Sequence, residues 1–217
     1  MKKLLPVILL TCLATSAFSL DLSVGAGTTV GGFSQTAYYE NYLFDSQKIV
    51  RTTIPFGFFA YVDATYGLVS VGFTMNGNTH TTNTMVDFFG TLINESDDEY
   101  SSGFLSFSLL GKFPFALGPV SMFPIAGIEY DLILYYHDDT GAALDTTNLD
   151  RFWFKVGVGS DIKIFKGLYV RPLALIGFKL LNADERQDVQ DAEDAGATKA
   201  RMTDVVFEGG VQVGWRF

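Results

Sequence analysis

The sequence predicts an all-β fold, an eight-stranded antiparallel up-and-down transmembrane β-barrel. The chain is apolar overall, with a mean hydropathy of +0.23, yet after residue 20 no apolar run is long enough for a transmembrane helix. Apolar and polar residues alternate instead with a period of two, which is typical of strands. The connections between the alternating segments are short and long in turn, an asymmetry typical of membrane-spanning barrels.

The first four predicted strands each carry an apolar residue at every second position. They are segment 20–31 with Leu22, Val24 and Val30; segment 53–66 with Ile54, Phe56 and Phe58; segment 68–77 with Val69, Val71 and Phe73; and segment 102–114 with Leu105, Phe107 and Leu109. Each segment is long enough to cross a bilayer as a tilted strand.

The last four predicted strands repeat the pattern up to the final residue. They are segment 120–136 with Ile128, Tyr130 and Leu132; segment 151–165 with Phe152, Phe154 and Val156; segment 168–181 with Val170, Ala174 and Ile176; and segment 203–217 with Val211, Val213, Trp215 and Phe217. An even number of strands places both ends of the barrel domain, 20–217, on the same side of the membrane.

The connections predict which side that is. Short ones follow the second, fourth and sixth strands, at 66–67, 114–119 and 165–167. The long, polar ones are 32–52, 78–101, 137–150 and 182–202. Short turns are periplasmic and long loops are external in such barrels, so both termini are expected in the periplasm. Within the second long loop, Thr84 to Ile93 is expected to form a short helix.

The polar face of the strands is predicted to line the lumen. Glycines gather on this face, and small residues suit the tight interior of a small barrel. Charges of both signs share it, namely Asp63, Lys112, Glu129, Asp131, Lys155, Asp161, Lys163, Arg171, Lys179, Glu208 and Arg216. Aromatic residues near the strand ends, such as Phe113, Tyr169 and Trp215, suit the two membrane interfaces. The alternative is a soluble lipocalin-like binding barrel, in which the apolar face points inward.

A lumen charge network is the best-motivated constellation of functional residues. Its predicted members are Asp63, Glu129, Asp131, Lys155, Asp161, Arg171, Lys179 and Glu208. As a pairing hypothesis, Glu129, Asp131 and Glu208 face Lys155, Arg171 and Lys179. The network either plugs the barrel with ion pairs or lines a narrow path for small polar solutes. Because eight strands leave room for little more than side chains, the plugged form is favoured.

The terminal strand, Val211 to Phe217, resembles the last strand of outer-membrane barrels, which ends in Phe and is read by the barrel assembly machinery. The whole chain after residue 19 resembles the small eight-stranded barrels of the OmpA/OmpX/OmpW type. This resemblance implies a location in the bacterial cell outer membrane and contact with its lipids. An OmpW-like barrel implies passage of small hydrophobic molecules through an apolar lumen, and the charged face predicted here departs from that pattern.

The N-terminal segment predicts secretion. Lys2 and Lys3 precede the apolar run Leu4 to Leu13, and Ala17-Phe18-Ser19 fits a cleavage site after residue 19, so 1–19 is expected to be a signal peptide. The competing interpretation is a lipoprotein box ending at Cys12. Cys12 is the only cysteine, and cleavage after Ser19 would leave no thiol chemistry.

Composition and motifs exclude several functions. A net charge of −9 argues against nucleic-acid binding, which needs a basic surface. The two histidines, His80 and His137, fall in predicted loops without the spacing of a metal site or a catalytic triad. No enzymatic activity, catalytic residue, metal or cofactor is therefore expected.

Two functions remain in competition. The first is a narrow pore or transporter for small solutes, which the sequence favours slightly. The second is a structural or adhesive surface barrel with a plugged lumen, acting through its long acidic loops on host or surface ligands. For the acidic runs themselves, such as Glu95 to Glu99 and His137-Asp138-Asp139, simple solvation is favoured over ligand binding.

Overall fold

The computed structural model describes residues 21–41, 46–87, 90–98, 100–138, 140–146, 149–180, 183–194 and 197–217. The expected signal peptide, 1–19, and the alternative lipoprotein box at Cys12 lie outside the described residues, as do Glu99 and Asp139 of the acidic loops.

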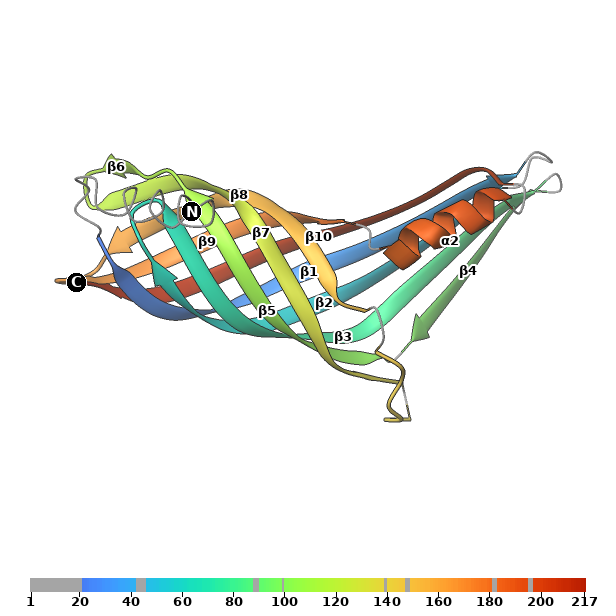
Figure 1. The fold of residues 1–217 in the computed structure, drawn as a ribbon, viewed down its shortest axis with the longest axis horizontal. Helices are drawn as coiled ribbons and strands as arrows, with labels where there is room; N and C mark the ends of the chain where they lie inside the picture. The colour runs from blue at the N-terminus through green and yellow to red at the C-terminus, as the bar shows by residue number, and fades with distance from the viewer. Residues whose placement is uncertain are drawn as a thin grey trace, which may run out of the picture.

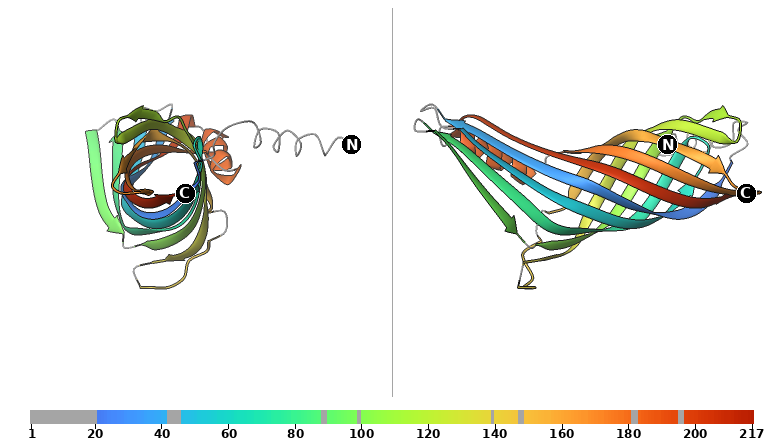
Figure 2. Two further views of the ribbon diagram at one scale, coloured as in Figure 1. Left: turned by 90° about the vertical axis from the view of Figure 1, so that its left-hand side faces the viewer. Right: turned by 180° about the vertical axis from the view of Figure 1, so that it is seen from behind.

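Eight antiparallel strands form a closed ring, which confirms the predicted fold class (Figure 2). In ring order they are β1 (Ser23–Asn41), β2 (Ser46–Asp63), β3 (Gly67–Asp87), β5 (Ser101–Lys112), β7 (Val120–His137), β8 (Arg151–Lys163), β9 (Leu168–Leu180) and β10 (Ala197–Arg216). The last strand closes the ring on the first, with a continuous register from Ser23 opposite Arg216 to Gln35 opposite Asp204. Closure leaves no sheet edge within the barrel, as a bilayer requires.

The two faces of the wall differ as the alternation predicts. Apolar residues at every second position point outward, and Val24, Val71, Phe107, Val158 and Val211 are each exposed on the outer surface. The intervening polar residues are buried inside. An apolar exterior around a charged interior is the arrangement of a transmembrane barrel and the reverse of a lipocalin. The chain is therefore an integral outer-membrane-type barrel.

The long connections contain more strand than expected. Four ring strands, β1, β2, β3 and β10, continue past the barrel rim as a curved sheet, visible at the right-hand end of Figure 1. The expected loops 32–52 and 78–101 are largely part of this sheet, hereafter called the outer extension. A further strand, β4 (Gly90–Asp98), pairs with the end of β3 and borders the outer extension.

The helix expected over Thr84 to Ile93 is wrong. Thr84 lies directly opposite Ile93 in the β3–β4 hairpin. Threonine recurs along β3 at positions 79, 81, 82 and 84, and β-branched residues favour strands over helices. The adjacent edge of β2 supplies backbone partners for this part of β3, which an isolated loop helix would leave unused.

Two small elements occupy other connections. Helix α2 (Ala183–Asp194) lies in the expected loop 182–202 and packs beside β10, as Figure 1 shows. Strand β6 (Phe115–Leu117) pairs with β7 at one of the short turns. The short turn before β9 uses Gly167 at a φ of 78°, a left-handed conformation that glycine adopts without strain. No helix among the described residues is long and apolar enough to cross a membrane.

Candidate functional site in the barrel lumen

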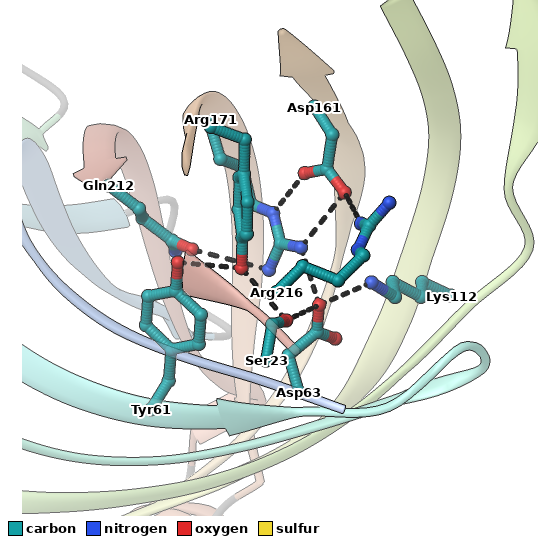
Figure 3. A network of polar contacts seen from close by, with 9 residues as sticks. Ser23, Tyr61, Asp63, Lys112, Asp161, Arg171, Gln212 and Arg216 are labelled. Atoms are coloured by element: carbon teal, nitrogen blue, oxygen red, sulfur yellow. Dashed lines mark hydrogen bonds and ion pairs between the residues drawn. The ribbon is translucent and has the colours of Figure 1, made fainter. Parts of the chain in front are cut away.

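The end of the lumen near the short turns is filled around one arginine, which Figure 3 shows. The Nε of Arg171 donates to Oδ1 of Asp161 at 2.6 Å, and its Nη2 donates to Oδ2 of Asp63 at 2.6 Å. The Arg171 side chain is 0% exposed. Arg171 is on β9 and Asp161 is on the neighbouring strand β8, whereas Asp63 is on β2, so the ion pair between Arg171 and Asp63 crosses the lumen. We call this group, with the neighbours described next, the inner layer.

Further polar groups complete the inner layer. The Nζ of Lys112 donates to Oδ2 of Asp63 at 2.6 Å, and Nη2 of Arg216 donates to Oδ2 of Asp161 at 2.9 Å. The hydroxyl of Ser23 donates to the same Oδ2 of Asp63 at 3.2 Å. Each carboxylate is therefore shared by two cationic side chains, which lowers the desolvation penalty of burying it.

Aromatic rings enclose the arginine. The guanidinium carbon of Arg171 lies 5.3, 5.2 and 5.1 Å from the ring centroids of Tyr61, Phe123 and Tyr169. The Tyr61 hydroxyl donates to the Tyr169 hydroxyl at 3.0 Å. Ring faces attract a cation, and three of them together exclude water from around it. Ion pairs and contacts with aromatic rings together therefore hold Arg171 in place.

Glycines on the neighbouring strands β1 and β10 make room for the two tyrosine rings. A Cβ on Gly214 would lie 2.3 Å from the Tyr61 hydroxyl oxygen and 2.5 Å from Cζ of Tyr169. A Cβ on Gly25 would lie 2.4 Å from the same Tyr61 oxygen. The glycine-rich lumen face inferred from sequence therefore has a local cause: the two tyrosines occupy the space that other side chains would need.

A second group, the middle layer, crosses the barrel further from the short turns. The Nζ of Lys155 donates to Oε1 of Glu129 at 2.5 Å and to both carboxylate oxygens of Glu208 at 2.7 Å. These residues lie on β8, β7 and β10, so the lysine is bound from two sides. Lys155 is 1% exposed. A fully buried ammonium with three short contacts therefore occupies the lumen at this level.

The outer layer borders the rim. The Nε1 of Trp153 donates to Oδ2 of Asp131 at 2.7 Å, and Nζ of Lys179 lies 3.3 Å from Oδ2 of Asp204. The guanidinium carbon of Arg151 lies 4.9 Å from the Phe33 ring centroid and 4.2 Å from that of Phe104. This layer therefore combines aromatic rings with charged side chains, as the inner layer does.

The eight sequence-predicted site residues all lie in these layers, but several pairings differ from the hypothesis. Glu129 and Glu208 both contact Lys155, whereas Arg171 contacts Asp63 and Asp161, and Lys179 contacts Asp204. Asp131 accepts a hydrogen bond from a tryptophan instead of pairing with one of the three cations. Register decides these partners, and alternation carries no information about register.

Lys163 lies directly opposite Tyr169 in the β8–β9 register and so shares the lumen face, as expected, but its side chain is exposed at the end of β8. The assignment of Tyr169 is wrong. Tyr169, expected at the membrane interface, is 2% exposed and points into the inner layer. Successive side chains of a strand point to opposite faces, and the neighbouring Val170 faces outward. The alternation itself would therefore have placed Tyr169 inside the barrel.

Residues that the sequence hypothesis did not single out complete the site. They are Ser23, Tyr61, Trp153, Asp204 and Gln212, all buried, and Arg151 at the rim. Each occupies an inward position of its strand. The alternating position of these residues along their strands was the available signal. The sequence hypothesis concentrated on charged residues and left out the inward-facing aromatic and amide side chains.

The histidines contribute nothing to these layers. His80 is exposed on β3 in the outer extension, and the ring of His137 stacks on Tyr135 at a centroid distance of 5.3 Å. Within the described ranges, no group of three or more His, Cys, Asp or Glu side chains is arranged to hold a metal ion. In the loop after β7, Thr140 and Ala142 donate hydrogen bonds to Asp138 and lower the pKa of its carboxyl group.

The space left inside the barrel is uneven. Beside the middle layer, cavities of about 50 and 20 Å³ border Lys155, Glu129 and Glu208. Such volumes hold isolated water molecules. Above the outer layer, where the outer extension begins, a cavity of about 300 Å³ is lined by residues from all eight ring strands. We call it the vestibule.

In comparisons with known proteins, the matches are with solved structures. No protein-family model matches the chain, and no curated protein matches it. Among solved structures, Neisserial surface protein A superposes with a TM-score of 0.41 at 11% identity, covering 86% of this chain and 96% of that one. The outer membrane protease OmpT from Escherichia coli gives 0.43 at 8% identity, covering 94% and 100%. The translocator domain of the autotransporter NalP from Neisseria meningitidis gives 0.29 at 10% identity, covering 100% and 95%.

Proposed function

We propose that this protein is a closed outer-membrane barrel that acts at its external end, as a binding or adhesive surface protein, and does not conduct solutes. The observation that carries the proposal is the burial of charged side chains across the lumen. Arg171 and Lys155 lie in two successive layers, each hydrogen-bonded to carboxylates from two other strands. A hydrated solute would have to break both sets of contacts, and each would leave buried charges without partners.

The distribution of free space supports the same function. The cavities beside the middle layer are several times smaller than the vestibule. Ligand pockets begin at about 300 Å³, and among these three cavities inside the described part of the barrel the vestibule reaches that size. The outer extension adds a large surface of strands and α2 around it, beyond the membrane-spanning part.

Planar-bilayer recording tests the proposal. The mature protein is refolded in detergent, its folding is checked by the heat-dependent gel shift, and single-channel current is measured. We expect a silent barrel, and we expect small conductance steps only from the double variant Lys155→Met with Arg171→Met, because a solute has to pass both the middle layer and the inner layer. The matched control, Lys163→Met, removes an exposed lysine from the same strand and should stay silent.

Discrete steps from the wild-type barrel, altered by Arg171→Gln or Glu208→Gln, would overturn the closed-lumen proposal. That result would support the narrow pore that the sequence favours. A silent wild type together with a silent Lys155→Met variant still fits a closed barrel and shows that the inner layer alone suffices to close it.

We also propose that the last strand acts as the signal for the barrel assembly machinery. The Phe217 amide donates to the Leu22 carbonyl at 3.0 Å, while its side chain is 76% exposed at the end of the wall. A side chain with so little contact contributes little to the folded barrel. Phe217→Ala should therefore leave the unfolding midpoint of refolded protein unchanged while lowering the amount inserted in cells. Equal insertion of variant and wild type would contradict this role.

A further inference from the structure

The vestibule differs in charge from the rest of the chain. The charged side chains that line it are Arg51, Arg151, Lys179 and Asp204. Three of these side chains are cationic and one is anionic, so the lining contains more positive than negative side chains. The chain as a whole has a net charge of −9. A positive cavity at the external end of an acidic barrel attracts anions locally, because low-dielectric walls concentrate the field.

Part of the vestibule lining consists of flat, apolar aromatic rings. Phe33 and Phe104 lie on either side of the Arg151 guanidinium, at 4.9 and 4.2 Å from its carbon. Two tyrosines, Tyr100 and Tyr136, add ring surface to the wall, with ring centroids 5.6 Å apart. Polar groups that can both donate and accept, such as the Gln35 and Asn76 amides, complete it. Apolar walls with a few convergent polar groups are characteristic of small-molecule sites.

We propose that the vestibule binds a small organic anion with a flat apolar body, such as an aromatic carboxylate. Arg51 and Arg151 bind the carboxylate, since a guanidinium presents paired donors that match its two oxygens. The rings of Phe104 and the tyrosines contact the body of the ligand. This inference rests on the proposed external role of the barrel, because the ligand enters from outside and the outer layer prevents it from passing through.

The floor of the vestibule contains a natural reporter. The Trp153 ring contacts Phe33 edge to face at a centroid distance of 5.9 Å, and Phe33 lines the cavity. The other tryptophan, Trp215, lies on the lipid face near the opposite end of the barrel. In a Trp215→Phe protein the fluorescence therefore reports on the vestibule floor alone.

The test is a titration of the refolded Trp215→Phe barrel with benzoate, followed by Trp153 fluorescence and by calorimetry. Benzyl alcohol supplies the ring without the charge, and inorganic phosphate supplies an anion without the ring. We expect saturable binding of benzoate and at least tenfold weaker binding of the other two compounds, because each lacks one half of the recognition. Arg51→Gln and Arg151→Gln should each weaken benzoate binding about tenfold, the usual effect of losing a charge-assisted hydrogen bond.

The matched control is Arg201→Gln, which removes an exposed arginine from β10 in the outer extension without touching the vestibule lining. It should leave benzoate affinity unchanged. Absence of saturable binding to the folded barrel, equal binding of benzyl alcohol, or an equal loss in Arg201→Gln would each overturn the proposal. None of these results bears on conductance, so the closed-lumen proposal is tested separately in the planar bilayer.

Discussion

Arg171 shows how strongly one buried charge depends on its partners. It contacts two carboxylates and three aromatic rings, with no exposed surface. The carboxylates have other cationic neighbours, Lys112 and Arg216, so removing the arginine leaves each of them half-compensated. The loss of unfolding free energy on removing Arg171 is therefore expected near the lower end of the range for broken buried ion pairs.

At this scale we predict that Arg171→Met lowers the free energy of unfolding by about 3 kcal/mol, because two buried carboxylates lose a partner. Urea-induced unfolding of the barrel in lipid vesicles, followed by tryptophan fluorescence, measures the change. Lys163→Met is the control, since its side chain is exposed, and it should shift the midpoint little. A loss no larger than the control's would mean that the inner layer is not an ion-pair network in the membrane.

A second residue-scale prediction concerns Gly214. The variant Gly214→Ala should destabilise the barrel by about 1–3 kcal/mol, because its Cβ would meet both lumen tyrosines. The control lies on the same strand: a Cβ on Gly209 would have only the Val30 carbonyl oxygen nearby, at 3.9 Å. Gly209→Ala should therefore have a much smaller effect in the same unfolding assay. Adding Tyr61→Phe to Gly214→Ala should restore part of the stability, and a fully additive double variant would contradict the steric explanation.

At the scale of elements, the outer extension is where sequence patterns were least informative. Strands β8 and β9 end where the predictions place them, within two residues, because both faces of each are constrained by lipid and lumen. Beyond the rim neither constraint acts. Strands β1, β2 and β3 continue there with mixed polar residues, and only the presence of a neighbouring strand decides that they stay extended.

The β3–β4 hairpin offers a direct test. Asn83 and Asn94 are opposite each other in the register, so cysteines at the two positions should form a disulfide under mild oxidation. The mature chain is expected to lack Cys12, which leaves no competing thiol. Non-reducing electrophoresis after protease cleavage between the strands detects the bond. The control pair is Asn83→Cys with Thr91→Cys, three residues out of register, and efficient cross-linking of that pair instead would show that the hairpin register is wrong.

At the scale of the whole molecule, the position of the membrane follows from where apolar side chains face outward. Val211 is 53% exposed on the outer wall. It pairs with Thr28 on β1 and Pro172 on β9, so it lies away from both ends of the barrel. Met85 is also exposed, but it lies on β3 in the outer extension. The two residues have similar chemistry and exposure and differ in the solvent that surrounds them.

We therefore predict that Val211→Arg lowers the free energy of unfolding in lipid vesicles by about 2–4 kcal/mol, the usual penalty for arginine near the bilayer midplane. Met85→Arg should change it by less than about 1 kcal/mol, because its side chain faces water. Chemical denaturation in vesicles measures both. Similar values for the two variants would place the outer extension within the membrane and would contradict the assignment of its residues to the external side.

The sequence by itself determined the number of ring strands, the direction of each strand face and the identity of most of the charged lumen residues. All three follow from the period of two, which a chain expresses locally without knowledge of its partners. Tertiary structure alone decided which charges pair, that Tyr61 and Tyr169 enclose Arg171, and that β1, β2, β3 and β10 continue beyond the rim. The physical reason is register: side chains that meet in the lumen, such as Ser23 and Tyr169, lie up to 146 residues apart in the inner layer, and closure of the ring, rather than any local pattern, sets which side chains meet.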